Sequence, residues 1–430
     1  MTSEYRHRVA IIGSGITGLA AAHALSSSYE ITVFEALDRV GGHANTVVVN
    51  EADQTLAIDT GFIVYNEPNY PGFVELLRAF DVATQPSEMS FSVSSALTGL
   101  EYRTSNLNTL LARRSNLLRP SFVRMLAEIP RFNRAARELV ESSDIAMSLN
   151  DFLDDGAFSR AFVDDYLIPL GASVWSADPQ RFGEFPAAPF ARFLHRHGLL
   201  TLGGRPQWRT VSGGSREYVS TLTAPWRDRI RTGCAVRGID RDDLGVVLHT
   251  GAHPDGERFD SVVLCTPANI ALSLLAAPTE AEVDVLGAFR YQRNRTTLHT
   301  DHSLLPRRLR AWASWNYRRV DAEQRVPVLT YYANRLQRLN AKADYCITLN
   351  ADDAIDPSRI IASFDYEHPV FDSAALGAQR RHHEIDGRQH TYYAGAHWGY
   401  GFHEDAVQSA WTATDRLLRG AARRDRAFAA

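Results

Sequence analysis

A buried strand that runs directly into a glycine-rich turn constrains the fold of this 430-residue chain more than any other feature. The apolar run Val9–Ile12 predicts a parallel strand, and Gly13, Gly15 and Gly18 follow it in the spacing G-x-G-x-x-G. Gly13 permits a tight turn, Gly15 lets the backbone approach a pyrophosphate group, and Gly18 lets the next helix pack close to the strand. The turn therefore predicts an α/β unit that binds phosphate groups through its backbone.

The elements after the turn fit a dinucleotide site. A helix expected from about Ile16 to Ser26, with Thr17 in its first turn, points its N-terminus at the turn, where N–H groups and the helix dipole favour negative charge. A second strand, Ile31–Glu35, ends in a carboxylate twenty residues after Gly15, and such an acid can accept both hydroxyls of an adenosine ribose. The alternative is a glycine-rich turn in an ordinary α/β unit, but the order of the elements favours a dinucleotide.

The overall composition narrows the class of protein. A chain of 430 residues predicts about two or three domains, and its 45% content of hydrophobic residues argues against disorder. The net charge of −4 gives no overall attraction for nucleic acid, and no apolar run reaches the roughly 18 residues of a membrane-spanning helix. The N-terminal residues MTSEYRHR lack the apolar segment of a signal peptide. We therefore expect a cytoplasmic protein.

The cysteines give no sign of a cross-linked or metal-binding framework. Cys234, Cys265 and Cys346 stand far apart in the sequence and form no C-x-x-C pair. This spacing suits a reducing compartment and predicts neither a disulfide framework nor a zinc or iron–sulfur site. We therefore expect no bound metal.

The residues that follow the second strand narrow the dinucleotide. Glu35, Ala36, Arg39, Gly41 and Gly42 spell E-A-x-x-R-x-G-G. This pattern resembles the extended N-terminal signature of the flavin amine oxidase superfamily, which includes phytoene desaturases and protoporphyrinogen oxidases. The resemblance implies FAD as the cofactor, with the arginine and the glycine pair along its pyrophosphate and ribityl chain. It also implies an α/β fold, with a GR2-type Rossmann-like FAD-binding domain and an inserted α+β substrate domain.

Further segments are similar to that superfamily in the same order along the chain. The sequence D-T-G-F, which ends at Phe62, resembles a turn beside the flavin, and the resemblance implies that a side chain at Gly61 would strike the ring system. A plain β-turn is the alternative. Val262–Pro267 resembles a V-V-x-A-T-P strand, and Val236 matches a valine whose backbone groups contact adenine.

The C-terminal segment from Thr391 to Ala406 is the second extended match to the superfamily. We expect a strand that ends at Gly395 and a helix that begins near His403 and continues to about Arg419. In the superfamily this helix N-terminus points at the flavin N1–C2=O edge, where N–H groups and the dipole stabilise negative charge. The resemblance implies that the backbones of Phe402 and His403 contact the flavin.

The catalytic side chains are less well defined by sequence. Amine oxidases of the superfamily hold a lysine near flavin N5, whereas the only lysine of this chain, Lys342, lies in a loop-like context. This departure argues against simple amine oxidation. A histidine near the flavin can accept a proton during desaturation, although each histidine taken alone is more typical of a structural role. The candidates are His43, His397, Tyr400 and His403, with Trp398 beside them.

Local patterns predict several elements between these motifs. Pro71–Phe80 predicts a short helix, Ser90–Thr104 a hairpin, and Gly233–Ile239 a strand. Further strands are expected at Thr296–His299, Ala311–Tyr317, Val328–Ala333 and Tyr345–Leu349. Residues 105–200 are expected to be mainly helical, with a kink at Pro130 and with aromatic residues that fill either a core or a substrate tunnel.

These elements predict two domains. The FAD-binding domain is expected to be discontinuous, at 1–85, 205–280 and 385–425, and the substrate domain to comprise 86–204 and 281–384, with 105–200 as its helical subregion. That subregion carries seven arginines between Arg113 and Arg137, which predict contact with anionic lipid at the inner membrane face. A solvated helix face is the alternative.

Three shorter patterns narrow the resemblance and the expected function. R-P-Q-W-R-T at 205–210, S-W-N-Y at 314–317 and G-F-H-E-D at 401–405 resemble a bacterial subfamily of amine-oxidase-like proteins associated with cyclopropane and other modified fatty acid synthesis. The resemblance implies an FAD-dependent oxidoreductase that removes a hydride from a fatty-acyl or lipid chain. The alternatives are an amine oxidase, a non-redox FAD isomerase, and a non-catalytic flavoprotein partner of a lipid methyltransferase.

Overall fold

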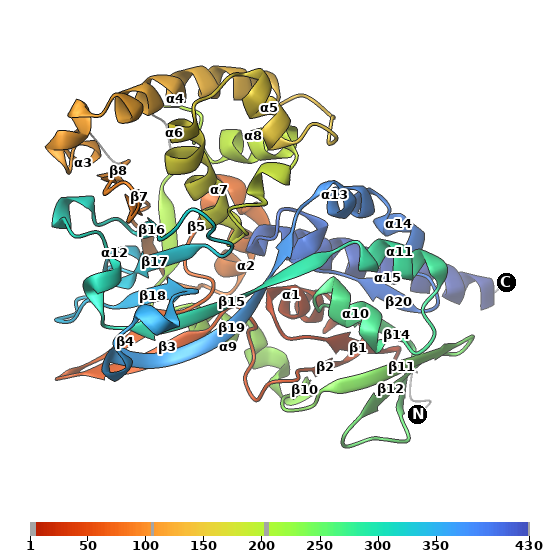
Figure 1. The fold of residues 1–430 in the computed structure, drawn as a ribbon. Helices are drawn as coiled ribbons and strands as arrows, with labels where there is room; N and C mark the ends of the chain where they lie inside the picture. Colours follow the sequence, from red (N-terminus) through yellow and green to blue (C-terminus); the bar gives the residue numbers. More distant parts are fainter. Residues whose placement is uncertain (1–5, 105–106, 202–205, 429–430) are drawn as a thin grey trace.

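The structure is a computed structural model that describes residues 6–104, 107–201 and 206–428. The expected domain boundary at 204–205, the start of the helical subregion at 105 and the first residue of the R-P-Q-W-R-T pattern lie outside the described residues. The fold is mixed α/β, as expected, and it is built around a parallel sheet and a larger second sheet (Figure 1). The exact domain limits stay a prediction.

The parallel sheet carries the N-terminal motif. Its strand order is β10-β2-β1-β14-β20, and every neighbouring pair is parallel. The strands are β1 (Arg8–Ile12), β2 (Glu30–Phe34), β10 (Ile230–Arg231), β14 (Ser261–Leu264) and β20 (Thr391–Tyr393). Three distant parts of the chain therefore meet in one sheet, with β1 at its centre.

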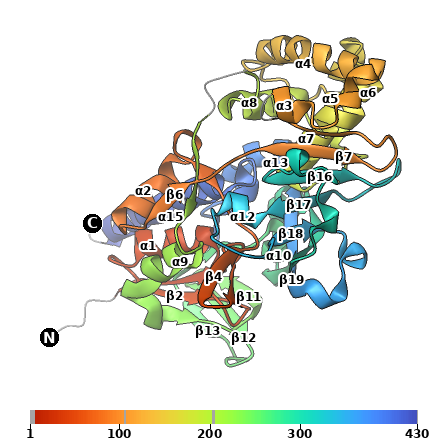
Figure 2. The ribbon, with the colours of Figure 1, turned by 90° about the vertical axis from the view of Figure 1, so that its left-hand side faces the viewer.

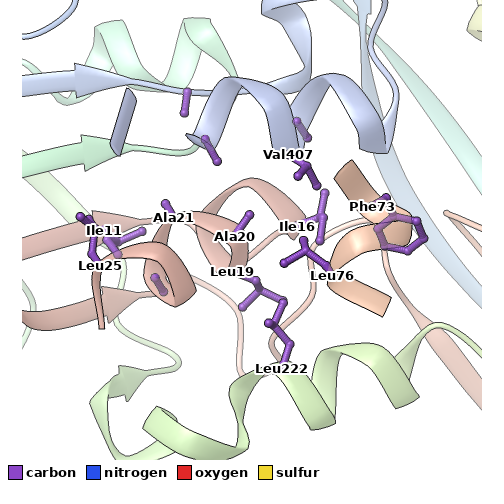
Figure 3. Close-up of a cluster of buried hydrophobic side chains, with 14 of the residues drawn as sticks. Ile11, Ile16, Leu19, Ala20, Ala21, Leu25, Phe73, Leu76, Leu222 and Val407 are labelled. Atoms are coloured by element: carbon purple, nitrogen blue, oxygen red, sulfur yellow. The ribbon is translucent and has the colours of Figure 1, made fainter. Parts of the chain in front are cut away.

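Both faces of this sheet are covered, which explains why its strands are apolar throughout. Val9 and Ile11 of β1 point into one core, whereas Ala10 and Ile12 point into another. Helices cover the first face, with Leu19, Leu222 and Val407 in the core between them (Figure 3). These helices are α1 (Ile16–Leu25), α2 (Pro71–Ala79), α9 (Arg216–Thr223) and α15 (His403–Phe428).

The second face is covered by a small antiparallel sheet and by helices. The sheet order is β11-β12-β13, from Val236–Asp242, Gly245–Thr250 and Glu257–Phe259. The helices are α10 (Ala268–Leu274), α11 (Glu280–Gly287), α13 (Ser373–Arg380) and α14 (His382–Ile385). The strand expected at 233–239 begins only at Val236, because Gly233 adopts a φ of +61° in the preceding turn. Helix α15 also continues past the expected end at Arg419.

A seven-stranded sheet forms the second half of the molecule, with the order β19-β15-β18-β17-β16-β7-β8. Its strands are β7 (Phe91–Ser95), β8 (Glu101–Arg103), β15 (Arg290–His299), β16 (Trp315–Arg319), β17 (Val328–Tyr332), β18 (Cys346–Leu349) and β19 (Ile360–Val370). Only the β16–β7 pair is parallel. The four strands expected between 296 and 349 and the β7–β8 hairpin are present, but β19 was missed.

A helical region packs over one part of this sheet (Figure 2). Its helices are α3 (Leu107–Leu110), α4 (Pro120–Glu138), α5 (Leu149–Asp155), α6 (Arg160–Phe162), α7 (Ile168–Trp175) and α8 (Ala187–Arg196), with a π-helical turn at Val163–Leu167. Helix α4 runs through Pro130 as one element. Trp175, Phe182 and Phe185 are buried together, so these aromatic residues form a core rather than an open tunnel wall.

Two smaller sheets connect the halves. Strands β3 (Thr46–Glu51) and β4 (Gln54–Asp59) form a hairpin, while β5 (Tyr65–Asn66), β6 (Thr84–Pro86) and β9 (Trp208–Val211) form a three-stranded sheet. The hairpin packs Leu56 and Ile58 against Leu298 and Ile347 of the seven-stranded sheet. Among the described helices, none is long and apolar enough to cross a membrane.

Candidate functional site

The glycine turn has the tight packing that its spacing predicts. Gly13 has a φ of +98°, and a Cβ atom there would lie 2.8 Å from the carbonyl oxygen of Cys265. A Cβ atom at Gly18 would lie 1.9 Å from the carbonyl oxygen of Gly13. Since neither backbone group can move without breaking the strand or the helix, both positions require glycine for the fold itself.

Gly15 differs from its neighbours because it faces open space. A Cβ atom there would meet no other atom within 4 Å. Gly15 is also the N-cap of α1, where no side chain caps the helix and no acid stands in the first turn, which holds Ile16, Thr17 and Gly18. The first N–H groups of a helix need partners, so this open, uncapped end is suited to an anion.

The E-A-x-x-R-x-G-G segment folds onto this end of α1. Gly41 forms a β-bridge with Gly15, and a Cβ atom at Gly42 would lie 3.0 Å from the Gly15 Cα atom. Arg39 donates from Nη1 to the carbonyl oxygen of Gly42 at 2.9 Å. The turn and the second glycine pair thus form one cradle of backbone, which fits the pyrophosphate of FAD.

Glu35 holds the cradle in place at the end of β2. Its Oε2 atom accepts hydrogen bonds from the backbone N–H (3.0 Å) and hydroxyl (2.5 Å) of Ser14, and its Oε1 atom accepts from the N–H of Leu37 (2.9 Å). A carboxylate can accept about four hydrogen bonds, so capacity remains for a ribose hydroxyl. The Cys234 N–H donates to the Glu35 carbonyl, which brings the segment before Val236 beside this acid, while Ala36 is exposed.

The D-T-G-F turn packs tightly against the protein backbone. A Cβ atom at Gly61 would lie 2.2 Å from the carbonyl oxygen of His43, and the N–H of Phe62 donates to that same oxygen at 2.8 Å. The protein backbone alone therefore requires glycine at position 61, and the expected contact of Gly61 with the flavin stays a prediction. Phe62 stacks on His403, with ring centroids 3.5 Å apart.

Asp59, at the end of β4, ties three elements together and was not recognised from the sequence. Its Oδ1 atom accepts hydrogen bonds from the hydroxyls of Thr46 (2.6 Å) and Ser215 (2.7 Å) and from the N–H of Ser215 (2.8 Å). Its Oδ2 atom accepts from Nε2 of Gln337 at 3.1 Å. Burial raises the pKa of this carboxyl to about 6. The contact joins the hairpin to α9 and to the seven-stranded sheet.

Three histidines, His43, His368 and His403, lie near one another although they come from distant parts of the chain. The His43 side chain is exposed, yet desolvation by the surrounding protein lowers its pKa to about 4. His368 and His403 are half-buried, and burial lowers the pKa of His368 to about 3 and that of His403 well below its usual value. The half-buried Cys265, beside the glycine turn, has its pKa raised by burial and shows the same combination.

A chain of amide groups fixes which nitrogen of His368 carries hydrogen. Asn350 donates from Nδ2 to the Pro327 carbonyl (3.1 Å), and its Oδ1 accepts from the Arg295 N–H (3.0 Å), so its orientation is set by backbone groups. The same Nδ2 donates to Oδ1 of Asn294 at 2.8 Å. Asn294 must therefore present its Nδ2 atom to its remaining partners.

His368 is one of those partners. Asn294 Nδ2 lies 3.1 Å from the carbonyl oxygen of Ser176 and 3.0 Å from Nδ1 of His368. An amide nitrogen only donates, so Nδ1 of His368 accepts and the neutral ring carries its hydrogen on Nε2. The register of the β15–β19 pair places Asn294 opposite Tyr366, so His368, two residues further along β19, lies diagonally across from Asn294.

His43 lies against this strand. Its ring stacks on Tyr366 with centroids 4.9 Å apart, meets His368 edge-on at 5.5 Å, and forms a hydrogen bond with the backbone of Glu367. The Tyr366 hydroxyl accepts from Asn45 Nδ2 at 2.9 Å. His43, His368 and Tyr366 thus form one packed cluster of rings, hereafter the histidine wall.

Of the four catalytic candidates, the structure brings together only His43 and His403. The His403 Nε2 atom lies 3.1 Å from the Tyr218 hydroxyl, and its position near His43 contributes to its lowered pKa. Because the Phe402 N–H donates to Oδ2 of Asp405 at 2.9 Å, that N–H is not free for a flavin, in contrast to the expectation. The N–H groups that α15 could offer to a flavin therefore begin with that of His403.

His397 and Tyr400 do not join this group. The His397 ring packs on Phe289 and Trp398, and burial together with nearby His382 lowers its pKa to about 3. It covers Gly395, where a Cβ atom would lie 2.4 Å from its Cε1 atom. The carbonyl of Tyr400 accepts a hydrogen bond from the Trp175 indole at 3.0 Å. The contacts of these two residues are therefore packing and backbone contacts within the protein, away from the pair His43 and His403.

Sequence reasoning missed His368 and Tyr366 because it assigned no strand between Leu349 and Thr391. A signal was available, since Ala362, Phe364, Tyr366, His368 and Val370 alternate along β19. Pro369 masks the signal, because proline is rare inside strands. Lys342 is exposed, and its backbone N–H donates to Glu51, away from the histidine wall, as its loop-like context predicts. The described residues contain no cluster of potential metal ligands.

Comparisons with known proteins agree with this architecture. The sequence profile of the family described as flavin containing amine oxidoreductase matches residues 16–294. Among curated proteins, the chloroplastic protoporphyrinogen oxidase 1 of Spinacia oleracea is 26% identical over 336 residues, which are 65% of this chain and 54% of that protein. The chain thus spans about half the length of this curated relative.

Solved structures with the same fold cover nearly the whole chain. A putrescine oxidase has a TM-score of 0.69 at 16% identity, covering 96% of this chain and 99% of that one. A CLA-producing fatty acid isomerase from P. acnes has a TM-score of 0.67 at 16% identity, covering 96% of this chain and 98% of that one. A putative protoporphyrinogen oxidase from Exiguobacterium sp. has 0.68 at 18%, covering 97% and 99%. The profile match, the fold and the fitted backbone cradle together place the chain in the flavin containing amine oxidoreductase family, a family of FAD-dependent oxidoreductases.

Proposed function

We propose that the protein oxidises an apolar substrate, with a fatty-acyl or lipid chain as the substrate class, by removing a hydride and a proton from adjacent carbon atoms. The observation that carries this proposal is the histidine wall, which offers neutral rings and a possible proton acceptor but no lysine. Burial keeps His43, His368 and His403 uncharged at neutral pH. The residues of the histidine wall include no carboxylate that could pair with an ammonium ion, which favours an uncharged substrate chain.

The backbone cradle would hold FAD. The open end of α1 at Gly15 and the glycine pair at Gly41 and Gly42 fit the pyrophosphate, and Glu35 fits the adenosine ribose. Bound FAD supplies a hydride acceptor, and the protein supplies orientation and exclusion of water. The remaining role, acceptance of the proton, belongs to a side chain of the protein.

His43 is the residue that we propose as proton acceptor. Its hydrogen bond with the backbone of Glu367 assigns a hydrogen to one ring nitrogen, since a carbonyl oxygen only accepts. The other nitrogen keeps a lone pair, and desolvation lowers the pKa so that this lone pair is free at neutral pH. Bound FAD would accept the hydride of one C–H bond, and His43 would accept the proton of the adjacent C–H bond, which would leave a C=C bond.

Three alternatives remain, and the comparisons lend support to the first two. Amine oxidation is supported by family membership and by the fold shared with a putrescine oxidase. Non-redox isomerisation is supported by the fold shared with a fatty acid isomerase. A non-catalytic flavoprotein that assists a lipid methyltransferase is a third, which co-purification of such an enzyme with the protein would support.

The test is an anaerobic visible spectrum of the purified flavoprotein before and after three additions: a bacterial phospholipid extract, putrescine and cyclohexylamine. Bleaching of the oxidised flavin band by lipid alone is expected. His43→Gln should slow this bleaching at least tenfold, whereas His383→Gln, at an exposed histidine of helix α14 (His382–Ile385), should not.

The other outcomes decide between the alternatives. Bleaching by an amine but not by lipid would replace the proposal with amine oxidation. Double bonds that change position, detected by mass spectrometry while the flavin stays oxidised, would replace it with isomerisation. A spectrum that no addition changes, combined with co-purification of a methyltransferase, would favour the partner role.

A further inference from the structure

A patch of exposed leucines and arginines lies at one end of the seven-stranded sheet, where α3 lies beside β8 (Figure 1). We call it the leucine–arginine patch. Its apolar residues are Leu97, Leu117, Leu118 and Leu309, and its basic residues are Arg114, Arg124, Arg307, Arg308 and Arg310. They come from the β7–β8 turn, from the segment before α4, from the first turns of α4 (Arg124) and from the loop after β15.

Hydrogen bonds hold these segments together. Arg119 donates from Nη1 to the carbonyl of Thr98 at 2.8 Å, and Arg113 donates to the carbonyl of Gly99, which joins the segment before α4 to the β7–β8 turn. The Arg307 N–H donates to Oε1 of Glu101 in β8 at 3.1 Å, and the 3-10 turn Leu309–Ala311 packs against β8 and α3. The patch is therefore continuous.

The exposure of the leucines is unusual for a protein surface that faces only water. Leu118 is 84% exposed and Leu309 is 72% exposed, with Leu117 and Leu97 near one half. A single exposed leucine needs no explanation, but several on neighbouring segments mark a surface that contacts something apolar. The side chains sit on short turns that hydrogen bonds hold in place, so they are presented outward by the fold.

The patch gathers basic side chains on a chain whose net charge is −4. Glu101 of β8 lies beside them, where it accepts a hydrogen bond from the Arg307 N–H. Arg124 pairs with Glu128 on its own helix at 3.3 Å. In the part of the chain that the structure describes, Arg114, Arg307, Arg308 and Arg310 form no ion pair, which leaves their guanidinium groups for an outside partner.

We propose that the leucine–arginine patch docks the protein on the surface of an anionic phospholipid bilayer. The arginines bind lipid phosphates, while the leucines enter the boundary between headgroups and acyl chains. Guanidinium groups bind phosphate through paired N–H donors, and exposed aliphatic side chains gain by leaving water. This proposal goes beyond the proposed function and does not depend on it, because binding needs neither FAD nor turnover.

The composition of the patch favours lipid over other polyanions. Proteins that bind single-stranded nucleic acid combine basic grooves with aromatic side chains on which bases stack, and the patch residues include none. Nucleic acid also offers no environment that would accept four leucines. The sequence alone indicated basic residues between 113 and 137, and the structure replaces that broad region with a smaller surface that includes Arg307, Arg308 and Arg310 from elsewhere in the chain.

The test is co-sedimentation of the purified full-length protein with vesicles of phosphatidylcholine alone or mixed with phosphatidylglycerol. Binding only to the mixed vesicles is expected. The double variant Arg114→Ser/Arg310→Ser should weaken that binding by about tenfold or more, since each basic residue near an anionic surface contributes roughly fivefold. Leu118→Ser/Leu309→Ser should weaken it further at 0.3 M salt, where charge is screened and apolar insertion dominates.

Matched controls separate the patch from general surface effects. Leu244→Ser, at a leucine 76% exposed in the β11–β12 turn, and Arg237→Ser, at an exposed arginine of β11, should leave vesicle binding unchanged. Thermal unfolding of each variant checks that it folds. Equal binding of wild type and both double variants would overturn the proposal. The patch would instead be assigned to a soluble polyanion if only the arginine variant lost vesicle binding and the wild type bound heparin as tightly as it binds the mixed vesicles.

Discussion

The phosphate-binding cradle and the histidine wall are built by different means. The cradle is made of backbone, from residues within about thirty positions of each other, and its key residues are glycines. The histidine wall is made of side chains that come from opposite ends of the chain and depend on a buried network of amides. A cofactor site formed by backbone atoms tolerates few substitutions, whereas side chains that line a substrate site can be replaced without unfolding the protein.

The largest effect is expected in the cradle, where Gly15 and Gly18 should respond differently. Gly15→Val places a side chain in the open space at the end of α1, so the protein should fold but lose FAD, with affinity lowered at least 100-fold. Gly18→Val forces a side chain against the Gly13 carbonyl and should prevent folding. Absorbance at the flavin band and far-UV circular dichroism measure the two outcomes. A folded, yellow Gly15→Val protein would refute the assignment of the phosphate turn.

The second prediction concerns Asp59, which connects the two halves. Asp59→Ala leaves the donors of Thr46, Ser215 and Gln337 without an acceptor, so the free energy of unfolding should fall by about 3 kcal/mol. Asp53→Ala, at the exposed turn of the same hairpin, is the control and should change it by less than about 0.5 kcal/mol. Urea denaturation measures both. If the two variants lose equal stability, the contact does not join the halves.

Asp59 and the histidines should also give opposite pH dependences. The folded pKa of Asp59, about 6, lies above its ordinary value, so the folded state binds more protons between about pH 4 and 6 and this group lowers stability as pH rises. The folded pKa values of His43 and His368 lie below their ordinary value, so these groups raise stability over about pH 4 to 6.5. Asp59→Asn should therefore steepen the rise of stability with pH. An unchanged slope would show that Asp59 ionises normally.

A further prediction tests the amide network that holds His368 of the histidine wall. Asn294→Asp replaces the donor at His368 Nδ1 by an acceptor, so the hydrogen of the ring should move from Nε2 to Nδ1, and its pKa should rise. Nitrogen NMR shifts of the His368 ring report the tautomer directly. Turnover should fall by about tenfold without loss of FAD. Asn269→Asp, at an exposed position of α10, is the control. An Nε2-protonated ring in the variant would show that Asn294 does not set the tautomer.

The smallest effect is expected at His397, which lies outside the wall. Its Nε2 atom is buried without a hydrogen-bond partner among the described residues, so His397→Phe removes an unpaired polar atom from an aromatic site. Stability should change by less than about 1 kcal/mol, and the rate of flavin reduction should stay within twofold of wild type. A large loss in that rate would return His397 to the list of catalytic candidates.

The features found from sequence are those with a local period or spacing. The G-x-G-x-x-G turn, the helix at Pro71–Ala79 and the hairpin around Thr98 each involve residues a few positions apart, so their geometry is set before the chain folds further. The expected start of the strand at Gly233 failed because a single positive φ, which the sequence does not reveal, moves the boundary to Val236.

The cofactor end of the protein could thus be found from its residues alone, since a phosphate cradle is a property of one short segment of backbone. The histidine wall, where β19 brings His368 and Tyr366 against His43, depends on the folded arrangement, and so does the patch to which Leu118 and Leu309 belong. The physical reason is that these groups interact across more than a hundred positions of chain. Their proximity follows from strand pairing and packing, which no local pattern of residues encodes.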